Sequence, residues 1–435
     1  MLFSILALMA VEATAATITG VNLGGWLLIE EWMFSNGQFD RVAEEDDSPQ
    51  GVIMPPLLPD GPGFNWYSEG DLISKLADEF SPEFAVEVIE AHRSSYITDE
   101  DVQKMKEAGI SAVRMPLGYW AFLGGSYNDE AMLYTDPAHE DKKFVTISTD
   151  FLTSQVKRFV NEGIDVLLDI HAMPGGSSQG SYSGIFPSTP MFWDDEELQQ
   201  QGLDIVTNMM DFYDNLDEET RAGIVGMTLM NEPAHNMADK ADLMTEWIAN
   251  ASDIFRERIV KVRGAASLPF PKLYVNLIET SIQPQAIVDF FLDTFSADEL
   301  ASWAILDIHH YFAWDGGHNG CYGGDCSYTC SSSATEEGLK AIDSIVIDGA
   351  KSSHEFFFAN GSIPLVSCSE YSLATFDRSE QACRGQTILK SMHDNQATAF
   401  EKQGLYGAYF WTWKMPYGGT HEESWSLKNY LGLGS

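Results

Sequence analysis

The sequence predicts an α/β protein folded as a (β/α)8 barrel, and two observations carry this prediction. Eight short apolar runs recur along the chain, and most are followed by the polar–apolar pattern of a helix. This alternation implies right-handed βαβ units and a parallel sheet, and eight units in one domain favour a closed barrel. An open doubly wound sheet is the alternative, because strand order cannot be read from sequence. No G-x-G-x-x-G motif follows a strand, which argues against a dinucleotide-binding version of that sheet.

The chain boundaries predict a short leader followed by one domain. The 435 residues, 44% of them hydrophobic, are enough for a single large core. The start MLFSILALMAVEATAA is apolar and ends in small residues, so we expect a secretory signal over 1–16 and the barrel over 17–435. No later apolar run is long enough to cross a bilayer. We therefore expect a secreted monomer without a membrane span.

The predicted strands follow in order along the chain. The first covers residues 21–30, and the others read AVRMPLG, DVLLDIH, GMTLMNE, KLYVNLI, WAILDIHHY, PLVSCSEY and GAYFWTW. A long insert rich in Pro, Gly and acidic residues separates the first two strands, over residues 36–90. After it, Thr98 begins a helix with an N-cap and an acidic first turn, and Gly109 ends that helix.

Polar and aromatic residues stand at or near the ends of these strands, where a buried strand needs none. In a barrel, the carboxyl ends of the strands form the mouth that carries the active site. The sequence therefore predicts that these side chains converge on one site: Arg114, His171, Asn231, Glu232, His309, Tyr311, Glu370, Trp411 and Trp413.

Strand geometry predicts which of these side chains share a face, because residues two apart point the same way. His309 and Tyr311 should face the site, with His310 on the opposite side. The same alternation predicts that Trp411 and Trp413 share a face.

Two carboxylates among histidines and aromatic rings suit the cleavage of a glycosidic bond. One carboxylic acid protonates the leaving oxygen, and the other carboxylate attacks the anomeric carbon or activates a water. The formal net charge of −40 repels nucleic acid and anionic lipid and suits a neutral substrate. We expect no cofactor and no metal.

The sequence gives weaker support to two other kinds of chemistry, a serine hydrolase and a metal site. GSSQG (176–180) matches G-x-S-x-G, but no helical pattern follows it and His171 precedes the serine, unlike a nucleophile elbow. A metal site built from His309, His310 and His318 has no spacing known for a ligand set.

The five cysteines indicate disulfides rather than zinc. Cys321, Cys326 and Cys330 lie in the loop CYGGDCSYTC, which lacks a paired Cys-x-x-Cys spacing. Secretion favours disulfides, and an odd count leaves one thiol over. Alternation should bury Cys368 in the barrel beneath Glu370, so we expect Cys368 to be that thiol, with Cys383 and the loop cysteines oxidised.

Two sequons for N-glycosylation, at Asn250 and Asn360, also fit secretion.

Taken together, the motifs resemble those of glycoside hydrolase family 5, a family of clan A retaining β-glycosidases. The likeness is greatest to its fungal-type exo-β-1,3-glucanases and runs from about Gly20 to about Trp425. The motifs that carry it are GVNLGGWLLIEEW, VRMPLGYWAF, DIHAMPGGSSQG, LMNEP, DIHHYF, SEYSLA and YFWTWK.

This resemblance implies retaining hydrolysis of β-glucosides, with Glu232 as acid/base and Glu370 as nucleophile. It also implies that Trp314, with Tyr182 as a candidate partner, clamps the next sugar. The positions that match residues around the sugar at the cleavage point are Glu30, Arg114, His171, Asn231, His309, Tyr311 and Trp413. The negative charge of Glu370 should raise the pKa of Glu232 and keep it protonated, while Arg114 keeps Glu370 ionised.

The chain departs from the family pattern at several points. Where the family has Gly-Glu-Trp around the nucleophile, this chain has Ser369-Glu370-Tyr371. The family's Gly-Ala-Pro-Gly is Ala172-Met173-Pro174-Gly175 here. The 36–90 insert and the cysteine loop have no counterpart that the motifs identify.

The leading hypothesis is thus a secreted exo-β-1,3-glucanase acting on a β-glucan. An endo-β-glucanase or β-mannanase would use the same two glutamates. A non-catalytic glucan-binding protein on this fold is the alternative from another class, although both carboxylates are present.

Overall fold

The computed structural model describes residues 17–34, 66–277, 282, 284–313, 355–360, 362–375, 385–416 and 422–434. Trp314, His318, Cys383, the cysteine loop, residues 1–16 and the side chain of Asn360 lie outside the described residues.

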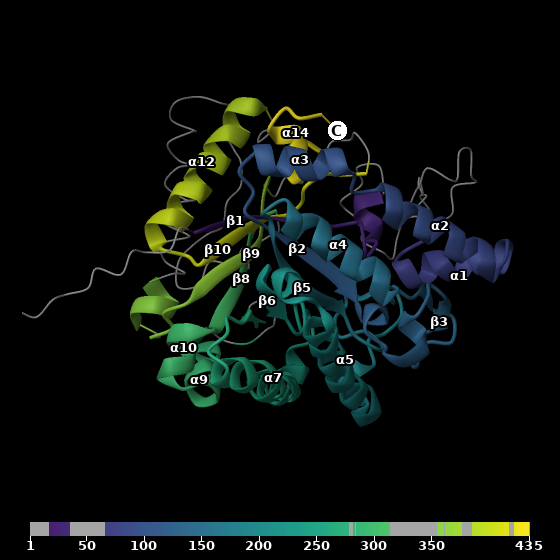
Figure 1. Ribbon diagram of the computed structural model, residues 1–435, viewed down its shortest axis with the longest axis horizontal. Coiled ribbons are helices and arrows are strands. Elements are labelled where there is room, and N and C mark those ends of the chain that lie inside the picture. Colours follow the sequence, from purple (N-terminus) through teal and green to yellow (C-terminus); the bar gives the residue numbers. More distant parts are fainter. Residues whose placement is uncertain are drawn as a thin grey trace, which may run out of the picture.

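Eight parallel strands close into a barrel, in the order β1-β10-β9-β8-β7-β6-β5-β2, with helices arranged around them (Figure 1). The (β/α)8 prediction is confirmed. The barrel strands are β1 (Ile18–Asn22), β2 (Ala112–Gly118), β5 (Asp165–Ala172), β6 (Ile224–Thr228), β7 (Lys272–Asn276), β8 (Ala304–Phe312), β9 (Val366–Thr375) and β10 (Gly407–Phe410). A short antiparallel pair, β3 (Leu133–Thr135) and β4 (Lys143–Val145), lies outside the barrel sheet.

Each predicted apolar run overlaps one strand, but four runs extend beyond the end of theirs. The first strand ends at Asn22, the fourth at Thr228, the fifth at Asn276 and the eighth at Phe410. Glu30, Asn231, Glu232, Trp411 and Trp413 therefore stand on turns beyond the strands. The apolar residues in these turns are buried. Because buried turns and buried strands are both apolar, the apolar runs predicted strands that were too long.

The barrel interior is built in layers that follow the two-residue repeat of the strands. The lowest layer is apolar and consists of Ala112, Leu167, Tyr274, Ile305 and Tyr409. Two glycines make room for its rings: a Cβ at Gly20 would lie 2.1 Å from Tyr409, and one at Gly226 would lie 2.4 Å from Tyr274. Two residues further along their strands, Arg114, Asp169 and Asp307 form a charged layer. The apolar layer is thus a closed floor beneath the polar one.

Amphipathic helices cover the outside of the barrel. The main ones are α3 (Asp99–Glu107), α4 (Thr149–Asn161), α5 (Glu196–Asn215), α7 (Ala241–Phe255), α9 (Pro284–Thr294) and α12 (Gln386–Gln403). The N-terminal prediction for α3 is confirmed, because Thr98 caps it in a capping box with Asp101. Gly109 follows its end with φ +80°. Among the described residues, no helix is long and apolar enough to cross a membrane.

The second half of the predicted insert, residues 66–90, is helical. It forms α1 (Glu69–Glu79) and most of α2 (Pro82–Ser95), each capped by a serine. Arg93 of α2 is buried, lies 3.6 Å from the Glu69 carboxylate and donates to the Val145 and Thr146 carbonyls. Glu69 in turn accepts the backbone N–H of Ile29, so these helices hold the turn that carries Glu30.

The prediction for Cys368 is confirmed in one part and wrong in the other. Cys368 is buried and unpaired, but it does not lie beneath Glu370. The register of β9 shifts after Cys368: Ile308 pairs with Cys368, whereas His309 pairs with Glu370. The extra residue turns Ser369 and Glu370 inward and leaves Cys368 in the outer core between barrel and helices. A β-bulge of this kind breaks the two-residue alternation on which the prediction rested.

Candidate active site

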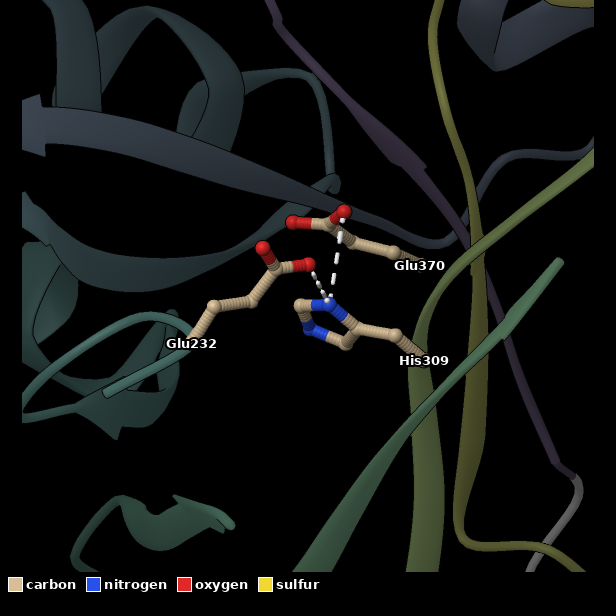
Figure 2. A group of neighbouring side chains, drawn as sticks. All are labelled: Glu232, His309 and Glu370. Atoms are coloured by element: carbon tan, nitrogen blue, oxygen red, sulfur yellow. Dashed lines mark hydrogen bonds and ion pairs between the residues drawn. The ribbon is translucent and has the colours of Figure 1, made fainter. Parts of the chain in front are cut away.

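The predicted residues meet at the carboxyl ends of the strands. Figure 2 shows Glu232, His309 and Glu370 directed toward one another from three segments of the chain. The Nδ1 atom of His309 lies 2.7 Å from Glu232 Oε1 and 3.5 Å from Glu370 Oε2. One nitrogen or oxygen atom from each of the three side chains lies within 4.8 Å of those of the other two. The two carboxylates therefore face each other across a single small site.

Glu370 is held on both of its oxygens. Arg114 Nη1 donates to Oε1 at 2.6 Å, and the Tyr311 hydroxyl donates to Oε2 at 2.7 Å. His309 and Tyr311 share the inner face of β8, as alternation predicts, while His310 packs outward against Phe312 and Phe400. Charge-assisted hydrogen bonds such as these fix the direction of a carboxylate.

Arg114 is fully buried and organises the charged layer. Its guanidinium also donates to Asn22 Oδ1 at 3.0 Å and Asn231 Oδ1 at 2.6 Å, and it lies 3.1 Å from Asp169 Oδ2. Burial alone would lower the pKa of Arg114, but the charges of Asp169 and Glu370 outweigh it and raise that pKa. Arg114 therefore stays charged beside Glu370.

Asn231 and His171 extend this network. The backbone N–H of Asn231 bonds to the Ile170 carbonyl at 2.9 Å. Its side-chain nitrogen lies 3.4 Å from His171 Nε2. His171 Nδ1 lies 2.6 Å from Asp169 Oδ2, so in the neutral ring Nδ1 carries the proton and Nε2 accepts from the amide. The side-chain oxygen of Asn231 is thereby directed at Arg114.

Glu232 stands on a strained turn. Its φ of +36° is rare for a residue with a side chain. The Ser178 hydroxyl donates to its carbonyl at 2.5 Å. Strain of this kind persists where surrounding contacts determine the backbone, as they do at many functional sites.

The expectation that Glu232 is protonated in the free protein is wrong. Burial would raise the pKa of Glu232, but the hydrogen bond and charge of His309 outweigh burial and lower that pKa. Burial likewise would lower the pKa of His309, but the charges of Glu370 and Glu232 raise it to about 9. The shared proton therefore resides on His309, 2.7 Å from Glu232.

Glu30 is a third buried carboxyl group near the site. Burial raises its pKa to about 7, against the opposing charge of His171 and a hydrogen bond from Trp32. The Trp32 indole N–H donates to Glu30 Oε2 at 2.9 Å. The charges of Glu370 and Glu232 also act on Glu30, which places it beside the two facing carboxylates.

Aromatic rings form the walls of the site. Trp411 stacks on His171 with ring centroids 5.6 Å apart and planes 17° from parallel. Tyr182 lies edge-on to His171, with centroids 5.6 Å apart, and interacts with Glu232. Trp425, which the sequence did not single out, packs against Tyr311 at 5.4 Å. Flat apolar faces beside hydrogen-bonding groups suit a sugar ring.

The prediction that Trp411 and Trp413 share a face is wrong. Trp413 is buried in the outer core, where its indole N–H donates to Asp101 Oδ1 of α3 at 3.0 Å. Because β10 ends at Phe410, strand alternation does not continue through these residues. Trp411 faces the site and Trp413 anchors the barrel to α3. Trp314, the predicted clamp, lies outside the described residues.

Four supporting residues were missed: Asn22, Asp169, Asp307 and Ser369. The repeated triplet Asp-Ile-His contained a signal for two of them. Residues two apart share a face, so Asp169 lies below His171 on β5 and Asp307 lies below His309 on β8. Ser369 faces inward because of the bulge in β9, which the sequence does not reveal.

Two rival readings lose support from the geometry. Ser178 of GSSQG bonds to the Glu232 carbonyl, and only the three-residue turn Ser181–Ser183 follows it. His309 and His310 point to opposite sides of β8, so they do not ligate one metal. Within the described ranges, Glu232, His309 and Glu370 are the one group with metal-ligand proximity. Each of the three already has a hydrogen-bond partner, since Arg114 and Tyr311 donate to Glu370 and His309 bonds to Glu232. We therefore assign no ion to them.

The chain is similar in sequence to curated fungal proteins. A glucan 1,3-beta-glucosidase of Candida oleophila is 27% identical over 306 residues, which cover 68% of this chain and 59% of that protein. A probable glucan endo-1,6-beta-glucosidase B of Aspergillus flavus is 23% identical over 306 residues, covering 70% of this chain and 66% of that protein. No family model matches the chain.

Among solved structures, a rutinosidase from Aspergillus niger superposes with a TM-score of 0.64 at 16% identity, covering 97% of this chain and 98% of that one. The match shows a shared fold. The chain spans between 47% and 59% of the length of three of the glucan 1,3-beta-glucosidases that it matches. The resemblance to fungal-type exo-β-1,3-glucanases is confirmed by these relatives, which are named glucan 1,3-beta-glucosidases.

Proposed function

We propose that the protein is a retaining glycoside hydrolase that cleaves β-glucosidic bonds, acting as an exo-β-1,3-glucanase that releases glucose from β-glucans. The observation that carries the proposal is the facing pair Glu232 and Glu370, with oxygens within 4.8 Å. Retaining enzymes hold their carboxyl groups about 5–5.5 Å apart, whereas inverting enzymes need about 6.5–9.5 Å to admit a water.

In the first step, a Glu370 oxygen attacks the anomeric carbon while Glu232 gives a proton to the leaving oxygen. The glycosidic bond breaks and a glucosyl ester of Glu370 forms. Arg114 and Tyr311 aim Glu370, since they bond to its two oxygens. The proton reaches Glu232 from His309 Nδ1 at 2.7 Å, as sugar binding desolvates the pair.

In the second step, a water loses a proton to Glu232 and attacks the same carbon. The ester bond breaks, Glu370 leaves as a carboxylate, and glucose is released with its β configuration retained. The charge of Glu370 is absent in the ester, so the Nδ1 side of His309 then faces the carboxylate of Glu232 alone instead of those of Glu232 and Glu370.

The neighbouring groups support a glucose unit at this position. Glu30, His171 and Asn231 offer hydrogen-bond partners for hydroxyls, and Trp411 offers a flat face. Trp314 and Tyr182 remain our proposal for the clamp around the next sugar. We also propose that the protein acts outside the cell or in the cell wall, as a monomer, after removal of residues 1–16.

Covalent trapping tests the mechanism. A 2-fluoro β-glucoside with a good leaving group should label Glu370, and peptide mass spectrometry should locate the label. Glu370→Gln should be neither labelled nor active, whereas Arg158→Gln, on the outer helix α4, is a folded control that keeps both. A label on another residue, or an inverted first product by NMR, contradicts the proposal.

The product profile from laminarin separates exo from endo action. Glucose alone supports the exo-β-1,3-glucanase, and mixed oligomers support an endo-β-glucanase or, with mannan as substrate, a β-mannanase. Binding to laminarin without turnover of an aryl β-glucoside would support the non-catalytic glucan-binding protein.

A further inference from the structure

The bulge in β9 places Ser369 beneath His309, between this histidine and a buried carboxylate. The Ser369 hydroxyl donates to Asp307 Oδ2 at 2.6 Å, and its backbone N–H donates to Asp307 Oδ1 at 2.9 Å. His309 Nε2 lies 3.1 Å from the same hydroxyl oxygen. All three residues are fully buried. A chain of hydrogen bonds thus runs from Asp307 through Ser369 and His309 to Glu232.

Counting protons along this chain fixes the direction of each bond. A carboxylate only accepts, so the single proton of the Ser369 hydroxyl points to Asp307. The hydroxyl oxygen must then accept at its other side, and His309 Nε2 must carry a proton to donate. The remaining nitrogen, Nδ1, faces Glu232 Oε1 at 2.7 Å. While Glu232 is a carboxylate, Nδ1 also carries a proton and donates it to Glu232. Once Glu232 takes that shared proton, neutral His309 keeps its other proton on Nε2 and has a lone pair at Nδ1.

From this geometry we infer that Ser369, held by Asp307, is a positioning residue that fixes the tautomer of His309 and reserves Nδ1 for proton exchange with Glu232. The inference rests on the proposed function, in which Glu232 is the acid/base. The family that the chain resembles has glycine at the position of Ser369, so the hydroxyl is a feature of this chain. With glycine there, His309 Nε2 would have no hydroxyl to bind and either tautomer could form.

The charged groups around His309 are consistent with this role. Glu232 lies on the turn after β6, Glu370 on β9 and Asp307 on β8 itself, and all three act on His309. The charge of Arg114, from β2, acts on Asp307 and lowers its pKa against the effect of burial. Burial raises the pKa of Asp307 to about 6, so the carboxylate form that orients Ser369 prevails above that pH.

Leaving-group dependence provides the first test. Ser369→Ala should lower kcat/KM for phenyl β-glucoside by about tenfold or more, part of the roughly 10²–10⁴ that proton transfer contributes. For 2,4-dinitrophenyl β-glucoside, whose leaving group needs no proton, the loss should stay below about threefold. Ser369→Thr keeps the hydroxyl and should restore most of the activity. An equal fall in kcat/KM for both glucosides in Ser369→Ala would show that Ser369 has only a structural role, and would overturn the inference.

The pH profile provides the second readout. Without the acceptor at Nε2, protonated His309 is less stable, so the alkaline limb of kcat/KM should move down by about half to one pH unit in Ser369→Ala. Ser369→Thr should keep the wild-type limb. An unchanged limb in Ser369→Ala contradicts the inference. Ser369→Gly serves as a second variant if Ser369→Ala is unstable by thermal unfolding.

NMR of the ring nitrogens tests the tautomer without any substrate. In Glu232→Gln, where no carboxylate faces Nδ1 at 2.7 Å, neutral His309 should show a protonated Nε2 and a bare Nδ1, and the added change Ser369→Ala should give a mixture. A protonated Nδ1 in neutral His309 of Glu232→Gln would overturn the inference. If the wild type hydrolysed neither glucoside, the proposed function would fail, and this spectrum would still decide on the tautomer.

Discussion

At the scale of single residues, Glu232 is the group whose role depends most on its neighbours. Its pKa is low in the free protein because His309 donates to it, yet the proposed first step needs it protonated. The proton it needs lies one hydrogen bond away, on His309. Proton sharing within the pair therefore reconciles a low resting pKa with acid catalysis.

Removing Glu232 should separate the two proposed steps. In Glu232→Ala, kcat/KM should fall by about 10²–10⁴ for phenyl β-glucoside and change little for 2,4-dinitrophenyl β-glucoside. Because the second step then lacks its base, kcat for the activated substrate should fall, and azide should restore it by forming β-glucosyl azide. Glu370→Ala is the matched control and should lose activity on both substrates. Rescue by azide with an α product in Glu232→Ala would contradict the assignment.

Glu30 should make the protein less stable as pH rises. Its pKa is about 7 in the folded protein and 4.5 as an ordinary carboxyl group. Between these values the folded state binds more protons than the unfolded one, so the free energy of unfolding falls with rising pH. The full effect, reached above pH 7, is about 3 kcal/mol.

Glu30→Gln removes this titration. Relative to wild type, the variant should gain stability between pH 4.5 and 7.5 in urea unfolding followed by circular dichroism. Glu246→Gln, exposed on α7, is the control and should follow the wild type at every pH. A constant difference between Glu30→Gln and wild type would show that Glu30 does not hold its proton in the folded state.

At the scale of elements, strands and irregular segments differ in how well the sequence predicts them. Apolar runs and caps reveal the strands and α3, because burial and capping act locally. The inward turn of Ser369 depends on one extra residue in β9 relative to β8 and β10, and the composition of β9 carries no sign of it. The same holds for Trp413, whose direction is set by Asp101 on another element.

The helix pair α1–α2 is coupled to the site through one buried ion pair. Arg93 and Glu69 are both buried, and Glu69 binds the backbone beside Glu30. Arg93→Met leaves a buried carboxylate without its cation, which should cost about 3–5 kcal/mol of unfolding free energy. Because the turn at Ile29 loosens, KM for an aryl glucoside should rise in the folded variant.

A surface arginine provides the comparison for this element. Arg258 lies in the helical segment Arg256–Lys261, which follows α7, and forms a partly exposed ion pair with Asp211 of α5. Arg258→Met removes this pair and should cost about 0–1 kcal/mol of unfolding free energy, with KM unchanged. Urea unfolding and steady-state kinetics on the same preparations measure both effects. Equal destabilisation by the two changes would argue against a special role of the Arg93–Glu69 pair.

At the scale of the whole molecule, buried carboxylates paired with cations lie inside an acidic chain. Arg114 balances carboxylates within the barrel, whereas the chain as a whole has a formal net charge of −40. The fold follows from the alternation of strands and helices, and the site follows from the polar residues that interrupt it. The net charge determines neither the fold nor the site, because net charge affects solubility and the rate of association rather than the fold.

The net charge should instead discriminate between substrates according to their own charge. A carboxymethylated β-1,3-glucan is repelled by a chain of −40, and clefts of one sign change association rates by about 10–10³. The Debye length falls from about 30 Å at 0.01 M salt to about 3 Å at 1 M, so added NaCl should remove the repulsion. We expect kcat/KM for the carboxymethylated glucan to rise at least about tenfold over this range, while that for laminarin stays constant.

Reducing-sugar assays on both polymers at matched ionic strengths measure the ratio of the two kcat/KM values. A ratio independent of salt would show that the acidic surface does not act on substrates that approach the site.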